Sequence, residues 1–276
     1  MSFPIKFSRN LLAACAIASL AVAAPALAQD KKPFEPEVGQ AGKDVVWVPT
    51  SQALVNRMLD IGRLKPGEIH YDLGSGDGRT VITAAKRGAM AFGVEYNPKM
   101  VALSNYNAKQ AGASNANFIN GDIFQTDFSK ASLITLFLLP ELNVRLRPTI
   151  LKMKPGTRVV SNSFDMGDWN PDMTIRVEEG CQTYCTGYLW IVPAQVNGSW
   201  KSEAGDLTLQ QKYQQATGTL AKGDATMEIS DGKVTADVLT FTAGGVRYSA
   251  KVNGDKLEGT AMDGDASSAF AAQMVK

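Results

Sequence analysis

The chain has 276 residues, enough for one large domain or for a medium domain with a small companion. It is 45% hydrophobic and 20% charged, a balance that allows a substantial core and argues against disorder. The 28 basic and 27 acidic residues favour neither a nucleic-acid binder nor a polybasic membrane surface, and a single histidine, His70, argues against histidine triads and multi-histidine metal sites.

The first 28 residues have the pattern of an export signal. Lys6 and Arg9 form a positive start, residues 11–23 are apolar, and Ala26-Leu27-Ala28 is a small-residue cleavage site that would leave Gln29 as the new N-terminus. The apolar run is short for a membrane span of ~20 residues. We therefore expect an exported, periplasmic protein without stable membrane insertion after signal removal; an uncleaved membrane anchor is the alternative.

Two cysteines, Cys181 and Cys185, remain after removal of such a signal. An oxidising compartment would permit a disulfide across this five-residue loop, and two free thiols are the other possibility. A metal site is rejected because no second cysteine or histidine pair could complete it.

Residues 29–43 are expected to form a linker or arm, and from there to residue 194 the hydrophobic pattern alternates between strands and helices. Strand–helix–strand units predict a doubly wound, mostly parallel sheet with helices on both faces, a Rossmann-like α/β fold. A terminal antiparallel hairpin is expected to complete it. The predicted strands are 69–73, 90–95, 117–119, 133–138, 158–161, 174–177 and 188–192, and the helices are 51–61, 79–87, 98–111 and 141–151.

Residues 195–276 have a different sequence pattern. Turn dipeptides such as Asn197-Gly198, Asp231-Gly232 and Asn253-Gly254 separate short runs of alternating polarity, as in hairpins. We expect a small antiparallel β-sandwich or barrel, with helical character only in the last few residues.

The strongest chemical signal is a glycine-rich turn that follows the first predicted strand. Its spacing, Asp72-x-Gly74-x-Gly76-x-Gly78, places the third glycine one position too early for a dinucleotide fingerprint, and no Gly-Lys-Ser/Thr ending makes it a phosphate loop. The spacing resembles motif I of class I S-adenosylmethionine-dependent methyltransferases. That resemblance implies S-adenosylmethionine as the cofactor, with Asp72 near its methionine end and glycines that let the backbone approach it.

Two further acidic residues end predicted strands. Glu95 follows Gly74 by 21 positions, where a carboxylate can accept both ribose hydroxyls. Asp122 follows the third strand, and the resemblance makes it the acceptor of the adenine amino group, with Ile123 packing on the base. Each alone could be a turn or cap residue; three acids at successive strand ends favour a cofactor site.

Other segments resemble a narrower bacterial group, related to the ATP synthase c-subunit lysine methyltransferase family. They are Trp47-Val-Pro49-Thr50, DLGSGDGRTVITAA, GVEYNP and Pro155-Gly156-Thr-Arg-Val, within residues 40–175. The resemblance implies N-methylation of a protein lysine and places Thr50 near the cofactor's methionine end. A simple helix cap is the other interpretation of Thr50.

The methyl-accepting residues are less clear. Residues 138–143 follow the fourth strand, where this fold faces its substrate, and they lack the Asn/Asp-Pro-Pro-aromatic box of enzymes that methylate bases or glutamine. Glu141 could orient a lysine amine or accept its proton, and Asn143 is a second catalytic candidate. Glu141 could equally be an acid in the first turn of the next helix.

Several alternatives remain open at this stage. The chain could be an exported ligand- or protein-binding module built on a methyltransferase fold, or a methyltransferase acting on a small phenol- or quinone-like molecule. His70 is expected to be a core or edge residue, with a catalytic base as the alternative. Trp169 is expected to be a packed aromatic residue or else to line a substrate pocket.

Overall fold

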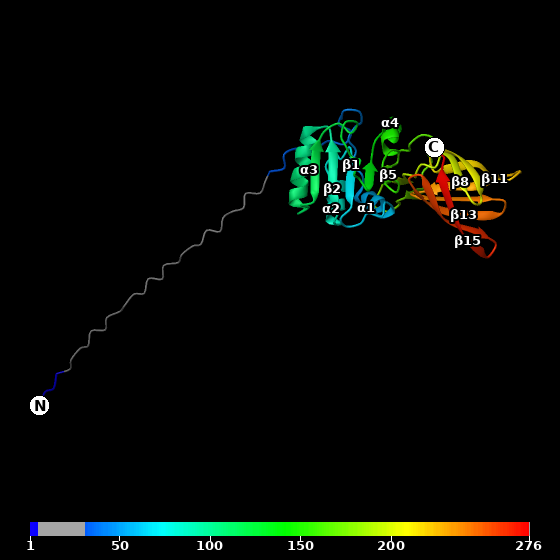
Figure 1. Ribbon diagram of the computed structural model, residues 1–276. Coiled ribbons are helices and arrows are strands. Elements are labelled where there is room, and N and C mark those ends of the chain that lie inside the picture. The colour runs from blue at the N-terminus through cyan, green and yellow to red at the C-terminus, as the bar shows by residue number, and fades with distance from the viewer. Residues whose placement is uncertain (5–30, 276) are drawn as a thin grey trace. The chain divides into compact units, whose positions relative to one another are not determined.

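The computed structural model describes residues 1–4 and 31–275, and residues 32–276 form one compact unit (Figure 1). The predicted export signal therefore lies, apart from its first four residues, outside the described residues. Within the described residues, no helix is long and apolar enough to cross a membrane.

The first half of the compact unit is a mixed sheet with helices packed against it (Figure 1). Seven strands lie in the order β3-β2-β1-β4-β5-β7-β6, with β7 antiparallel to β5 and β6. The predicted α/β fold is confirmed. The strands are β1 (Ile69–Leu73), β2 (Met90–Glu95), β3 (Ala116–Asn120), β4 (Leu133–Leu136), β5 (Arg158–Asn162), β6 (Met173–Arg176) and β7 (Thr186–Ile191); the helices are α1 (Gln52–Ile61), α2 (Arg79–Lys86), α3 (Pro98–Gln110) and α4 (Pro140–Ile150).

Local capping explains where two of these helices begin. The Ser51 hydroxyl accepts a hydrogen bond from the Leu54 amide at the start of α1, and the Asn97 side chain accepts one from Lys99 at the start of α3. Pro98 occupies the first position of α3, where its missing N–H costs no helical hydrogen bond. The predicted starts, residues 51 and 98, lie at or next to the observed ones because capping depends on neighbouring residues alone.

The sheet brings the carboxyl ends of β1, β2 and β4 to one edge, because β1 pairs in parallel with both neighbours. β1 is the first strand of the chain yet lies in the middle of the sheet, so the strand order reverses beside it. Ligands of open α/β sheets bind at such a reversal, outside the carboxyl ends of the strands. β4 ends at Leu136, two residues before the predicted end, and this releases Phe137 and Leu138 into the loop above the edge.

The second half of the compact unit is a closed antiparallel barrel, which selects the barrel over the sandwich. Its inward residues are apolar and nearly fully buried, and the aromatic rings of Phe241, Tyr248 and Phe270 contact one another inside it. The eight strands are β8 (Gly198–Ser202), β9 (Gly205–Lys212), β10 (Gln215–Lys222), β11 (Ala225–Thr235), β12 (Val238–Ala243), β13 (Val246–Asn253), β14 (Lys256–Asp263) and β15 (Ala266–Met274).

The expectation of helical character near the C-terminus was wrong. Residues 266–274 form β15, which pairs with β14 and also with β8 and so closes the barrel. Alanine-rich sequence favours a helix locally, but here the two neighbouring strand edges supply the hydrogen bonds that decide the conformation.

Three barrel strands contain a glycine whose backbone leaves no room for a side chain. A Cβ added at Gly218, Gly232 or Gly259 would lie 1.8–2.0 Å from a backbone oxygen of the adjoining strand. A side chain at any of these positions would force the neighbouring backbone to shift, so glycine is strongly favoured there, as expected where a sheet bends sharply to close.

The sheet and the barrel are joined by a buried polar contact. The indole N–H of Trp169 donates to Gln214 Oε1 at 2.9 Å, and Gln214 Nε2 donates to the Asn170 carbonyl at 2.8 Å. The ring of Tyr213 stacks on Trp169 with centroids 5.7 Å apart. Trp169 is fully buried here, so it is the packed aromatic residue of the two alternatives and does not line the pocket described below.

Candidate active site

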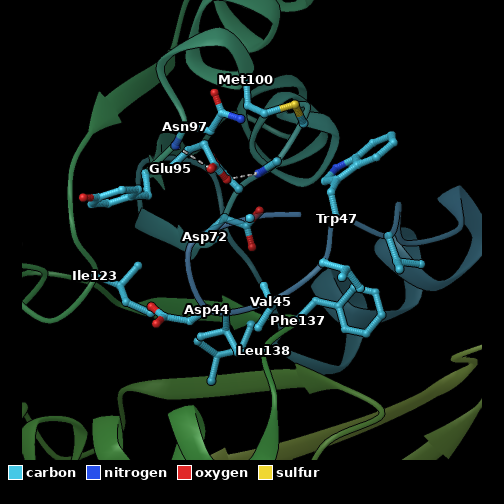
Figure 2. Close-up of a pocket in the computed structure, with 18 of the residues that line it drawn as sticks. Asp44, Val45, Trp47, Asp72, Glu95, Asn97, Met100, Ile123, Phe137 and Leu138 are labelled. Atoms are coloured by element: carbon cyan, nitrogen blue, oxygen red, sulfur yellow. Dashed lines mark hydrogen bonds between the residues drawn. The ribbon is translucent and has the colours of Figure 1, made fainter. Parts of the chain in front are cut away.

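A cavity of about 500 Å³ lies above the carboxyl ends of β1, β2 and β4. Its size falls within the ~300–1,000 Å³ range of small-molecule sites. Figure 2 shows Asp72 near its middle, with Glu95 on one side and Phe137 on the other. Seven of the eight predicted cofactor residues line it: Thr50, Asp72, Gly74, Gly76, Glu95, Asp122 and Ile123.

The glycine-rich turn forms the floor of this cavity. Gly74 and Gly76 both adopt left-handed backbone conformations, with φ of 83° and 55°. A Cβ at Gly76 would lie 2.7 Å from the indole nitrogen of Trp47, and one at Gly74 would lie 3.0 Å from Leu138. A side chain at either position would therefore fill the space that the turn leaves for a ligand.

Gly78, the eighth predicted residue, does not line the cavity. Its Cβ would meet Phe118 at 2.7 Å and Ser104 at 2.9 Å, so Gly78 lets the start of α2 pack against β3 and α3. The next residue, Arg79, pairs with Asp77 at 2.6 Å and donates to the Thr50 carbonyl at 2.9 Å. Arg79 thus fixes the segment before α1 to the glycine-rich turn.

Asp72 is a buried carboxylate held by a chain of side-chain hydrogen bonds. Thr135 Oγ1 donates to Asp72 Oδ1 at 2.6 Å and lies 2.9 Å from His70 Nε2. Because Thr135 has a single hydroxyl hydrogen, His70 Nε2 must carry the proton of that second bond. Burial, with a smaller contribution from the nearby Asp77 and Glu95 carboxylates, raises the pKa of Asp72 to about 7. A cationic ligand group beside Asp72 would stabilise the ionised carboxylate and so offset the effect of burial on this pKa.

His70 is a core residue, as expected, since it is fully buried and its pKa falls to about 3 through burial. The ring is therefore neutral at physiological pH. Its part in the site is to orient Thr135 and, through that hydroxyl, Asp72.

Glu95 organises the opposite side of the cavity. One carboxylate oxygen accepts from the Gly76 amide at 3.0 Å and the other accepts from the Asn97 amide at 2.9 Å. Burial raises the pKa of Glu95 although these bonds act against the rise. Each oxygen keeps a further lone pair, so both can still accept hydroxyl hydrogens, as a pair of ribose hydroxyls would require.

Asp122 contacts the arm that precedes α1. Lys43 Nζ lies 2.6 Å from Asp122 and 4.7 Å from the ring centroid of Tyr96. The hydrogen bond from Lys43 is the main reason that the pKa of Asp122 is lowered. The end of the predicted linker is therefore a strap across the cavity mouth, and the residues that follow it contribute Trp47 to the lining.

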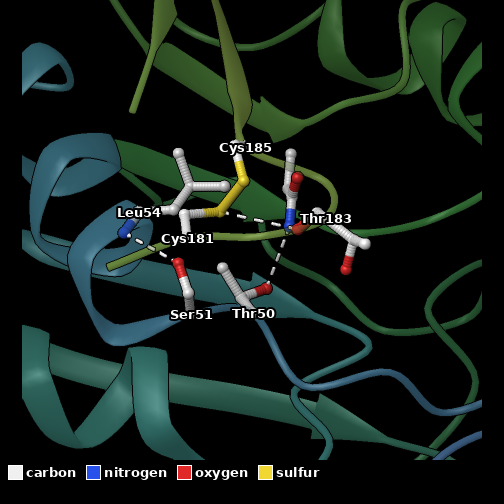
Figure 3. The surroundings of a disulfide bond; sticks show 7 residues. Thr50, Ser51, Leu54, Cys181, Thr183 and Cys185 are labelled. Carbon is white, nitrogen blue, oxygen red and sulfur yellow. Dashed lines mark hydrogen bonds between the residues drawn. A yellow bond between two sulfur atoms is a disulfide. The ribbon is translucent and has the colours of Figure 1, made fainter. Parts of the chain in front are cut away.

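Thr50 lines the cavity at the start of α1, and its hydroxyl accepts from Asn162 Nδ2 at 3.2 Å. The cap of α1 is Ser51, so the helix-cap interpretation of Thr50 was wrong. Figure 3 shows a disulfide beside Thr50 and Ser51: Cys181 and Cys185 are bonded, which decides between the two predicted states of these cysteines.

Three aromatic residues that sequence reasoning missed form another wall of the cavity. Phe137, Phe164 and Tyr184 are in mutual contact, with ring centroids 5.3–6.0 Å apart. They come from loops after β4, after β5 and before β7. Their positions beyond strand ends could have suggested a site, but no spacing in the sequence connects them.

The two predicted catalytic residues do not reach the cavity. Glu141 is exposed in the first turn of α4, as its alternative interpretation expected, and Leu139 and Leu142 line the cavity in its place. Asn143 is fully buried, and its Nδ2 donates to the carbonyls of Phe164 at 3.3 Å and Asp165 at 3.0 Å. It faces the sheet because α4 presents every third or fourth residue to the core.

Comparison with known proteins agrees with this geometry. Residues 72–173 match the model of the ANTKMT methyltransferase domain. A protein-lysine N-methyltransferase of Saccharolobus islandicus is 41% identical over 152 residues, which are 54% of this chain and 94% of that protein. The chain belongs to the family of S-adenosylmethionine-dependent methyltransferases. The matched residues 72–173 of this methyltransferase include the carboxyl ends of β1, β2 and β4, while Trp47, Thr50 and Tyr184 of the cavity lining lie outside that range.

Two further relatives of the methyltransferase are informative. The mouse ATP synthase c-subunit lysine N-methyltransferase is 35% identical over 130 residues, and the chain spans about half of its length (46% of this chain, 52% of that protein). A structure from Salinibacter ruber, titled an RNA methyltransferase in complex with S-adenosyl-L-homocysteine, is 43% identical with a TM-score of 0.50. The match covers 54% of this chain and 96% of that one.

Proposed function

We propose that the protein binds S-adenosylmethionine in the cavity of the sheet and transfers its methyl group to the side-chain amine of a lysine in a protein. The observation that carries the proposal is the arrangement of Asp72, Glu95 and Asp122 at successive strand ends around one cavity, above a glycine turn that a Cβ would obstruct. A site that no longer held this cofactor would have no physical need for three carboxylates there.

Each of these groups suits one part of the cofactor. Asp72, buried and with a raised pKa, would hold the methionine ammonium; Glu95 would accept the ribose hydroxyls; and Asp122 would accept the adenine amino group once Lys43 moves away from it. Bound there, S-adenosylmethionine supplies a methyl group on a positively charged sulfur. The chain's own contribution is to orient the reactants and to exclude water from the reacting centre.

The lysine acceptor is supported by the relatives, several of which are named protein-lysine or ATP synthase c-subunit lysine methyltransferases. The Salinibacter ruber structure is titled an RNA methyltransferase, but a protein with a net charge of +1 offers a polyanion little electrostatic attraction. A half-exposed rim that includes Leu139 and Tyr184 leaves the cavity open to a side chain that enters from solvent.

The first experiment is calorimetric titration of the purified chain with S-adenosylmethionine, beside the double variant Asp72→Ala, Glu95→Ala. We expect micromolar binding that the double variant loses. A second step supplies radiolabelled cofactor and lysine-containing extracts, and we expect label on protein that survives nuclease treatment and is released as methyl-lysine after acid hydrolysis. No binding by folded wild-type protein would refute the proposal, and label that nuclease removes would redirect it to RNA.

We also propose that the first 28 residues direct export to the periplasm. The disulfide between Cys181 and Cys185 supports this, because disulfides persist in oxidising compartments and are rare in the cytosol. Cell fractionation with intact-mass analysis tests the idea: a periplasmic chain that begins at Gln29 is expected, and a full-length cytosolic chain would contradict it.

A further inference from the structure

The cavity has an end that the expected cofactor contacts do not account for. Glu95 and Asp122 occupy the end assigned to ribose and adenine, and Figure 2 shows Phe137 on the far side of Asp72 from Glu95. Phe137, Phe164 and Tyr184, here called the ring trio, line this remaining part of the cavity. A methyl acceptor must approach the cofactor from a side that the adenosine does not fill, so the ring trio lies where an acceptor would be held.

The packing of the ring trio selects the shape of its ligand. The centroid distances are 6.0 Å for Phe137–Phe164, 5.3 Å for Phe137–Tyr184 and 5.9 Å for Phe164–Tyr184, with interplanar angles of 23°, 62° and 47°. Rings in direct contact leave no slot into which a flat aromatic acceptor could insert. A compact cation over the cavity side of the ring trio, in contrast, can lie within ~6 Å of a ring face, the distance over which that face attracts it.

The backbone supporting the ring trio is held in unfavourable conformations. Tyr184 has a φ of 56°, and Ser163, which directly precedes Phe164, has a φ of 58°. Left-handed conformations are rare for residues other than glycine and gather at functional sites, where the surrounding structure imposes them. Of the six non-glycine residues with positive φ in the described part of the chain, Ser163 and Tyr184 are the two that position a ring of the trio.

The constraints that impose these conformations are visible. The disulfide closes the loop of five residues that carries Tyr184, and the Ser163 amide donates to the Thr186 carbonyl at 2.8 Å. Asn143, buried beneath them, donates to the carbonyls of Phe164 and Asp165. Asn143 is therefore a positioning residue for the ring trio, although it does not line the cavity.

A hydroxyl group lies in the same cavity as the ring trio, and one ring of the trio is exposed to solvent. The Thr50 hydroxyl, which lines the same cavity, can donate its hydrogen while it accepts from Asn162. Tyr184 is 45% exposed, so the ring trio has one side open to solvent and the other toward Asp72. A long side chain with a cationic end could reach from solvent across this rim, whereas a lidded pocket would suit a free small molecule.

We propose that Phe137, Phe164 and Tyr184 form the subsite that receives the acceptor amine, a lysine-like alkylammonium group or its methylated forms, and that they select it over flat aromatic acceptors. This rests on the proposed lysine methyltransferase function and names its specificity-determining residues. The rings hold the cationic end by the attraction between their faces and its charge. For transfer, the ammonium would first lose one proton to solvent. The freed lone pair would then form the bond to the methyl carbon as the bond from that carbon to sulfur breaks, and S-adenosylhomocysteine would leave.

The test uses n-butylammonium chloride, with 1-butanol as a neutral probe of the same shape, titrated by NMR into the full chain saturated with S-adenosylhomocysteine. We expect butylammonium to bind more tightly than butanol. Tyr184→Ala and Phe164→Leu should each weaken butylammonium binding by about tenfold, while Tyr184→Phe retains it because the ring remains. Tyr106→Ala, a tyrosine on α3 outside the cavity lining, is the matched control and should change nothing.

Affinity for S-adenosylhomocysteine, measured on every variant, shows that each pocket is folded and should stay unchanged. Equal binding of butanol and butylammonium, or unchanged butylammonium binding in both Tyr184→Ala and Phe164→Leu, would overturn the subsite. Tighter binding of catechol than of butylammonium would overturn it in favour of an aromatic acceptor.

The subsite and the proposed function can fail separately. Lysine methylation with an unchanged KM for protein substrate in Tyr184→Ala would refute the subsite and leave the function standing. Ring-dependent binding of butylammonium in a wild-type protein that methylates no lysine would refute the function and leave the subsite standing.

Discussion

The α/β sheet and the barrel use their strands in opposite ways. In the sheet, the reversal of strand order beside β1 leaves a cavity above the carboxyl edge, lined by acids and rings from loops. In the barrel, alternate residues of every strand point inward and fill the interior with side chains such as Trp200, Leu207 and Phe241. The sheet is therefore built around a space for ligands, whereas the barrel is built around its own core.

The barrel core is expected to be sensitive to the loss of a single buried ring. Trp200 is fully buried, and its indole N–H donates to the Val196 carbonyl at 2.9 Å. Trp200→Ala should destabilise the protein by about 3–5 kcal/mol in chemical denaturation, through lost packing and the cavity it leaves. The neighbouring exposed residue gives the control, Lys201→Ala, for which we expect a change within about 1 kcal/mol because it loses only an exposed ion pair with Asp206. Weaker S-adenosylhomocysteine binding in folded Trp200→Ala would show that the barrel core supports the pocket.

The site on the sheet can be tested through the pH dependence of its affinity for S-adenosylmethionine. The pKa of Asp72 is raised to about 7, and the ammonium of a bound cofactor requires its ionised form. Below pH 7, S-adenosylmethionine affinity should fall about tenfold for each pH unit, which is about 1.4 kcal/mol per unit. Asp72→Asn should bind weakly at every pH and lose this dependence. His70 cannot account for the titration, because its pKa lies at about 3.

The same raised pKa predicts the stability of the ligand-free protein. A carboxyl group whose pKa is higher in the folded state than in the unfolded state stabilises at low pH, and this contribution is lost as the pH rises from about 4 to about 7. Asp72→Asn should therefore unfold at a higher temperature than wild type at pH 8 but not at pH 4. An equal difference at both values would contradict the assignment of the titrating group.

A third effect tests whether the two regions unfold together. Gln214→Ala removes both the acceptor of the Trp169 indole and the donor to Asn170. A buried donor left without a partner costs about 1–3 kcal/mol. We expect one cooperative transition in wild type and separate transitions for sheet and barrel in the variant, followed by near-ultraviolet circular dichroism. A single transition at an unchanged midpoint would show that other contacts join them.

The smallest effect concerns only the sheet. Ser51 caps α1 beside Thr50, and Ser51→Ala should cost about 1 kcal/mol of stability by removing the acceptor for the Leu54 amide. When Ser51→Ala is added to Gln214→Ala, the midpoint of the barrel transition should stay where it is in Gln214→Ala alone. A shift there would mean that α1 stabilises both regions.

The sequence predicted the elements that depend on neighbouring residues. The bounds of β1 and β2 were predicted correctly because short buried strands ended at recognisable turns and acids, and Asn97 and Pro98 fixed the start of α3. The acids Asp72, Glu95 and Asp122 could be placed together because parallel strands end at a common edge. The boundary proposed at residue 194 remains a prediction, because residues 32–276 form one compact unit.

What the sequence could not reveal depends on tertiary contacts. The position of Asn143 beneath the ring trio follows from the direction in which α4 packs, and Glu141 was placed at the site only because it follows a strand. The ring trio meets through three loops distant in sequence, and no local pattern records their contact. The strand β15 was missed because its neighbours, β14 and β8, provide the hydrogen bonds that an isolated segment lacks.

The glycines that hold the barrel strands together have a consequence for how this protein can vary. Outward-facing barrel positions can exchange one polar residue for another with little cost in stability. Any mutation at Gly218, Gly232 or Gly259, in contrast, places a Cβ within 2.0 Å of a neighbouring backbone oxygen. A saturation library should therefore tolerate change along most of the barrel exterior and lose nearly every variant at these three sites. The same spacing of fixed glycines would mark an equivalent barrel in a distant relative whose remaining sequence has diverged beyond recognition.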